Sequence, residues 1–79
     1  MIKFVEFHYY EEGEHRVSVD VFSIMRVIES PILDSNDTIT TLELNFAIGL
    51  NGERMPVTIA VKESYDEVMY QIRSAINAT

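Results

Sequence analysis

The chain has 79 residues and a mass of 9.1 kDa, which is enough for one small domain (1–79) with a correspondingly small core. Its hydrophobic fraction of 47% and charged fraction of 24% are typical of a folded soluble protein, and no apolar run is long enough to span a membrane. Six Lys and Arg against thirteen Asp and Glu give a net charge of −7, which disfavours direct binding to nucleic-acid phosphates. The chain has no cysteine, and no signal-peptide pattern follows Met1, so we expect a reducing, cytoplasmic location.

The first predicted element is a β-hairpin with residues 12–14 as a three-residue loop, in which Gly13 can take a left-handed conformation. That register gives one apolar face, on which Tyr9 faces Val17, Phe7 faces Val19 and Val5 faces Val21. On the other face Phe4 lies opposite Phe22, and Glu6 lies opposite Asp20, where two carboxylates would repel each other. The open end of this hairpin is therefore expected to be covered on both sides.

Residues 23–29 are predicted to form a short third strand, because apolar residues are dense there. A loop is expected to begin at Ser30-Pro31, and Asp34 to Asp37 continue it with side chains that favour turns. Ile32 and Leu33 lie inside this predicted loop, as an apolar plug or as a contact for a partner.

Asn51-Gly52 predicts a second hairpin, since this dipeptide tolerates the positive φ angles of a two-residue type I′ turn. The turn places four apolar pairs on one face: Ile48 with Met55, Phe46 with Val57, Leu44 with Ile59 and Leu42 with Val61. The alternate positions are mostly polar, so a slip of one residue would destroy the separation.

The last predicted element is a helix that begins near Ser64, where Ser64 and Glu67 have the spacing of a capping box. One apolar stripe follows at helical spacing, formed by Tyr65, Val68, Met69, Ile72, Ala75 and Ile76. Together the elements predict an α+β domain, an antiparallel β-meander of about five strands with one C-terminal helix packed on one face.

No convincing active site can be assembled from these residues. A metal ion could be held by His8 and His15 with the nearby acids Glu6, Glu11, Glu12 and Glu14, but solvated hairpin residues are the preferred interpretation. Ser18, His8 and Asp20 could be imagined as a catalytic triad, yet two strands of so small a domain supply neither an oxyanion hole nor a cleft. We expect no enzymatic activity, no metal and no cofactor.

Apolar residues exceed what one short helix can cover, and the chain has no disulfide to compensate for a small core. The residues predicted to form a partner interface are Phe4, Tyr10, Phe22, Ile32 and Leu33. Oligomerisation or docking to a larger protein would cover them. Equally, the loop of residues 30–37 could fold back over them.

Four segments resemble the small flagellar and swarming-motility proteins of the FlbD family. They are Ile24-Met-Arg-Val-Ile-Glu29, Asp37-Thr-Ile-Thr-Thr-Leu42, Asn51-Gly52 and Val61-Lys-Glu-Ser-Tyr-Asp-Glu-Val68. The resemblance covers roughly the last two-thirds of the chain. It implies a short β-meander that ends in a helix, and a non-enzymatic cytoplasmic accessory protein that acts through protein contacts.

The preferred function is a non-catalytic interaction or self-assembly module, whose partner is a second copy or a larger bacterial or phage protein. Between Arg26 and Arg54 the chain has acidic residues but no Lys or Arg, which either keeps the protein soluble or sets the choice of partner. The alternative is an oligomer that binds a nucleotide-type ligand at its subunit junctions, around aromatic side chains and Arg16 or Arg26.

Overall fold

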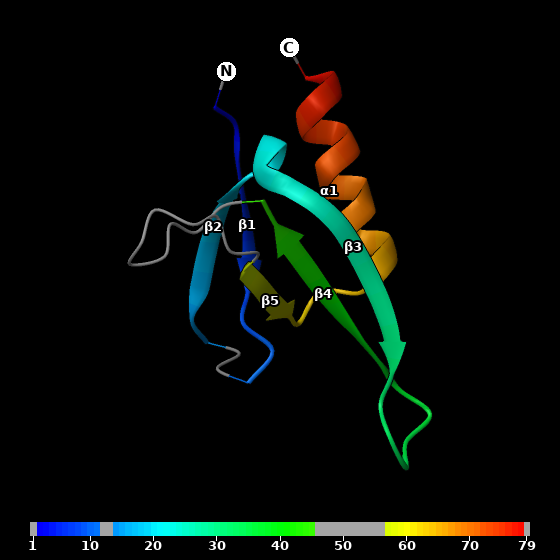
Figure 1. Cartoon of the computed structure of the whole chain (residues 1–79). Helices are drawn as coiled ribbons and strands as arrows, with labels where there is room; N and C mark the ends of the chain where they lie inside the picture. The colour runs from blue at the N-terminus through cyan, green and yellow to red at the C-terminus, as the bar shows by residue number, and fades with distance from the viewer. Residues whose placement is uncertain (1, 12–13, 46–56, 79) are drawn as a thin grey trace.

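The computed structural model describes residues 2–11, 14–45 and 57–78 (Figure 1). Within them the elements are β1 (Phe4–His8), β2 (Arg16–Asp20), the 3₁₀ helix η1 (Val21–Ser23), β3 (Ile24–Pro31), β4 (Thr38–Leu44), β5 (Val57–Val61) and α1 (Tyr65–Asn77). The strand pairings are antiparallel, and α1 packs against β1, η1 and β3. The predicted α+β fold, with about five strands and a C-terminal helix, is confirmed.

The strands form a two-stranded sheet, β1–β2, and a three-stranded meander, β3–β4–β5. The two are joined where residues 8–10 run beside residues 60–62, a junction that we call the seam. There the Tyr10 amide donates to the Ala60 carbonyl at 3.0 Å, and the Lys62 amide donates to the His8 carbonyl at 2.8 Å. The strand order across the seam is therefore β2–β1–β5–β4–β3, so the first hairpin joins the meander through β5.

The predicted register of the first hairpin is wrong by two residues. Val5 pairs with Val19 instead of Val21, and Phe7 pairs with Val17. A shift of two leaves every side chain on its predicted face, so the apolar pattern could not distinguish the two registers. The predicted contacts on the other face are lost: Phe4 pairs with Asp20 instead of Phe22, Glu6 pairs with Ser18 instead of Asp20, and Tyr9 bridges to Val61 instead of Val17.

The predicted register of the second hairpin is also displaced by two residues. Leu44 pairs with Val57 and Leu42 with Ile59, which again preserves the faces and changes the partners. Val57 therefore faces Leu44, and Phe46, its predicted partner, lies outside the described residues. The Asn51-Gly52 turn and the pair of Ile48 with Met55 lie outside the described residues.

The third strand is longer than predicted, since β3 continues to Pro31 and the expected loop start at Ser30-Pro31 is wrong. Proline, which lacks an amide donor, is tolerated at the end of an edge strand. A register shift between Ile24 and Arg26 marks a bulge at the start of β3. The turn between β3 and β4 contains Asp34, whose positive φ of 61° fits the predicted turn-forming role.

The core is enclosed by the two sheets and the helix. Its fully buried side chains are Phe7 of β1, Leu42 of β4, Val61 of β5 and Val68 of α1. The helix begins as predicted, with the Ser64 hydroxyl accepting a hydrogen bond from the Glu67 amide at 3.2 Å. From the predicted stripe, Val68, Ile72 and Ala75 pack on the core, whereas Ile76 is exposed.

Replacing Leu42 with Ala should lower the free energy of unfolding by about 2–5 kcal/mol, because it leaves a cavity in the core enclosed by the two sheets and the helix. The matched control is Leu33→Ala, at a leucine that is 88% exposed, which should change stability by no more than about 0.5 kcal/mol. Urea unfolding followed by circular dichroism measures both. Equal effects of the two substitutions would contradict the assignment of the core.

Candidate functional site

His8, the histidine of the imagined triad, pairs with the carboxylate of Glu63, which is 55 residues away along the chain. Its Nδ1 lies 2.7 Å from Glu63 Oε2, and its backbone amide donates to Glu63 Oε1 at 3.0 Å. Glu63 follows β5, so this pair extends the seam by side-chain contacts. In β2 the residue opposite His8 is Arg16, not Ser18.

The other members of the imagined triad are not near His8 in the register. Ser18 is exposed opposite Glu6. Asp20 is the N-cap of η1: its carboxylate accepts hydrogen bonds from the Phe22 amide at 3.1 Å and the Lys3 amide at 3.3 Å. Asp20 thus positions the turn that carries Phe22, and the structure does not bring the three residues together.

The candidate metal ligands of the first hairpin are also not gathered. In residues 2–11, 14–45 and 57–78, no group of three or more His, Asp or Glu side chains could hold a metal ion. Glu6 instead forms an ion pair with Arg16 at 3.5 Å. Glu11, Glu14 and His15 are exposed near the hairpin turn, and Glu12 lies outside the described residues.

Glu63 is nearly buried, with 11% of its side chain exposed. Burial acts to raise the pKa of its carboxyl, but the hydrogen bonds from the His8 ring and amide, the hydrogen bond from the amide of Glu63 itself and the electrostatic attraction to His8 together outweigh this effect. The pKa of Glu63 therefore lies below its ordinary value of 4.5. The pairing of Glu63 with His8 at the seam accounts for the lowered pKa without a catalytic role.

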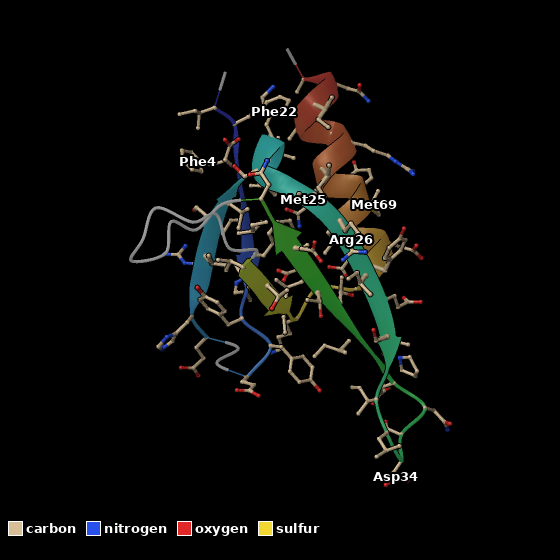
Figure 2. The ribbon with its side chains drawn as sticks, viewed as in Figure 1. Phe4, Phe22, Met25, Arg26, Asp34 and Met69 are labelled. Carbon is tan, nitrogen blue, oxygen red and sulfur yellow. The ribbon has the colours of Figure 1, made fainter. Side chains whose placement is uncertain are left out.

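Exposed apolar side chains gather at the end of the molecule that carries both chain termini (Figure 2). We call this surface the apolar end and define it by Ile2, Phe4, Phe22, Met25 and Ile76, each between 44% and 70% exposed. Hydrogen bonds connect its parts, because the Val21 amide donates to the Lys3 carbonyl at 2.8 Å and the Lys3 side-chain ammonium donates to the Ala78 carbonyl at 3.0 Å. The start of β1, η1 and the end of α1 thus form one surface.

A shallow apolar groove of about 270 Å³ enters this surface between α1 and β3. Its walls include Met25 and Ile76 of the apolar end, and it continues past Met69 and Ile72 of the helix. The bulge at the start of β3 lies beside Met25, which is 56% exposed. The helix and the strand therefore leave an apolar channel between them, open to solvent.

The predicted interface residues fall into separate places. Phe4 and Phe22 lie at the apolar end, whereas Ile32 and Leu33 lie in the turn beside Asp34 at the opposite tip (Figure 2). The eight residues of β3 separate these two places, a length of about 23 Å. The loop of residues 30–37 therefore does not fold back over Phe4 and Phe22. Tyr10 follows β1 near the hairpin turn and is 42% exposed.

Carboxylates gather away from the apolar end. They follow β1, end β3, occupy the turn after it and begin α1, and we call these exposed carboxylates together the acidic end: Glu11, Glu14, Glu29, Asp34, Asp37, Asp66 and Glu67. The charged residues beside the apolar end include Lys3, Asp20, Arg26 and Glu43, two of each sign. Arg26 there pairs with Glu43 at 2.6 Å, and Asp20 is the cap of η1. The amino-acid sequence alone does not reveal this segregation, because these carboxylates are distant from one another along the chain.

A second hollow, of about 490 Å³, lies on the outer face of β4 and β5. It is lined by Tyr9, Glu11, Thr41, Thr58, Ile59 and Ala60. Its only charged lining residue, among those the structure describes, is Glu11, which does not favour an anionic ligand. The two arginines considered for nucleotide binding lie elsewhere, each paired with a carboxylate.

Comparisons with protein-family models, with curated proteins and with solved structures find no match for this chain. The resemblance to the FlbD family therefore stays a prediction, and function has to be argued from the surface of the molecule. The described part of the chain contains no helix that is long and apolar enough to cross a membrane.

Glu63→Gln tests the pairing at the seam. Because folding lowers the pKa of Glu63, its carboxylate stabilises the fold above its ordinary pKa, and this contribution is lost as the pH falls through the lower folded-state pKa. The substitution should therefore lower the free energy of unfolding at about pH 6 by on the order of 1 kcal/mol, with the deficit shrinking toward about pH 3.

Glu29→Gln, at an exposed glutamate of β3, is the matched control for the loss of one negative charge. It should show no comparable deficit at either pH. Urea unfolding at both pH values measures these differences, and a deficit for Glu63→Gln that is the same at both would contradict the account.

Proposed function

We propose that this protein is a non-catalytic protein–protein interaction module whose contact surface is the apolar end. The observation that carries the proposal is the exposure there of Phe4 and Phe22, at 66% and 48%, together with three neighbouring apolar side chains. Scattered single apolar residues are normal on a surface, but a contiguous apolar patch marks a contact site. A cytoplasmic, bacterial or phage accessory role belongs to the same proposal and rests on the sequence.

The size of the patch supports this function. Each of the five side chains leaves roughly 100 Å² exposed, so together they approach about 500 Å², which is in the range of patches that mediate contacts. Aromatic residues at the centre of an interface contribute most of its binding energy. Phe4 and Phe22 are therefore the expected anchors, with the polar groups around them as a rim.

The alternative, binding of a nucleotide-type ligand at subunit junctions, has less support. Arg16 lies 3.5 Å from Glu6 and Arg26 lies 2.6 Å from Glu43, so a ligand phosphate would have to displace a carboxylate from either arginine. The net charge of −7 also disfavours an anionic ligand.

The double substitution Phe4→Ser with Phe22→Ser should abolish association with protein partners while leaving the fold intact. Both side chains are largely exposed, so we expect stability to change by no more than about 0.5 kcal/mol per site. Association is measured by immobilising the chain and recording which proteins it retains, first from a solution of the purified chain and then from a bacterial lysate. Urea unfolding measures stability.

The matched control is Tyr10→Ser with Leu33→Ser, which removes the two exposed predicted residues that lie outside the apolar end. It should retain association. If the control loses binding while the Phe4 and Phe22 variant keeps it, the contact surface lies at the other end of the molecule and the proposal is wrong.

A further inference from the structure

We infer that the occupant of the apolar end is a second copy of this chain, and that the two copies pair end to end with their acidic ends pointing apart. The inference rests on the proposed function, since it names the partner of that same surface. It is carried by two observations: the segregation of charge along the molecule, and the presence of an exposed ring and an apolar groove on the same end.

The charge distribution permits this pairing despite a net charge of −7 on each copy. The acidic end and the apolar end lie at opposite ends of elements that run along a molecule whose longest dimension is 39 Å. Charges in water at physiological salt are screened over about 8 Å. Two copies joined at their apolar ends would therefore hold their carboxylate clusters several screening lengths apart.

The same distribution argues against a head-to-tail arrangement. An apolar end placed on the acidic end of the next copy would remove carboxylates such as Asp66 and Glu67 from water without giving them partners, which is costly. Each copy then has only one surface that can pair, so association stops at the dimer. The pair is closed and two-fold symmetric, rather than a ring or a filament.

The surface is also suited to contact itself. Phe22 of η1 is 48% exposed and follows Val21, which lines the groove together with Met25 and Ile76, so each copy presents both a ring and a groove. A two-fold contact can insert the ring of each copy into the groove of the other, and the flexible side chains of Met25 and Met69 can adapt to it. A standard interface buries about 800 Å² on each partner, of which the apolar end would supply more than half.

The test is the solution mass of the full chain by light scattering, from low micromolar to near-millimolar concentration. The mass should rise from 9.1 kDa to a plateau at twice that value. Phe22→Ser should weaken pairing at least about tenfold, as expected for an anchor residue. Tyr70→Ser is the matched control, because Tyr70 is an aromatic residue that is 72% exposed on α1 outside the apolar end, and it should pair like the wild type.

The orientation of the pair can be measured independently, since the chain has no native cysteine to interfere with labelling. Spin labels on Asn77→Cys, beside the apolar end, should lie closer together in the pair than labels on Asn36→Cys, in the turn after β3. The opposite order would overturn the end-to-end arrangement.

The outcomes separate this inference from the proposed function. A mass of 9.1 kDa at every concentration overturns the inference, and if Phe4 and Phe22 are nevertheless required to retain a foreign protein, the proposed function stands. A mass that grows beyond twice the monomer overturns the closed pair. The third outcome is a dimer that persists both in Phe22→Ser and in the double variant of Phe4 and Phe22. It overturns the inference and also the assignment of the apolar end as the contact surface.

Discussion

The hydrogen bonds of the seam are the interaction on which the rest of the structure depends. A two-stranded hairpin alone is marginally stable, and a three-stranded sheet with one helix has little core of its own. The bonds from Tyr10 to Ala60 and from Lys62 to His8 place β1 against β5, and this brings Phe7 into the same core as Leu42 and Val68. Glu63 reinforces the junction by binding both the ring and the amide of His8.

The same arrangement accounts for the exposed apolar end. Within the described residues, the seam lies at the end of β1, so the start of β1 is held by β2 and η1, with Asp20 capping the turn. The helix starts beside the seam and directs Val68 into the core, but its last turn leaves Ile76 exposed next to β3. One helix of 13 residues cannot cover this end as well, which leaves Phe4 and Phe22 in solvent.

Most local features of this chain could be predicted from its sequence, although the loop start at Ser30-Pro31 was wrong, and the non-local features could not. The cap at Ser64 depends on neighbours along the chain and was predicted correctly, and so was the part of the helical stripe from Val68 to Ala75, whereas Ile76 is exposed. The hairpin registers failed by two residues because period-two patterns are unchanged by that shift. The pairing of His8 with Glu63, the separation of Leu33 from Phe22 and the segregation of charge arise from the strand order, which no local pattern encodes.

The most direct test of the account is hydrogen exchange of the Tyr10 and Lys62 amides, measured by NMR. If the seam unites the two sheets into one core, both amides should be protected to the same degree as those at the centre of β4, because they open only when the whole domain unfolds. If they exchange as fast as unprotected peptide amides while β4 stays protected, the hairpin is not held by the meander and the account is wrong.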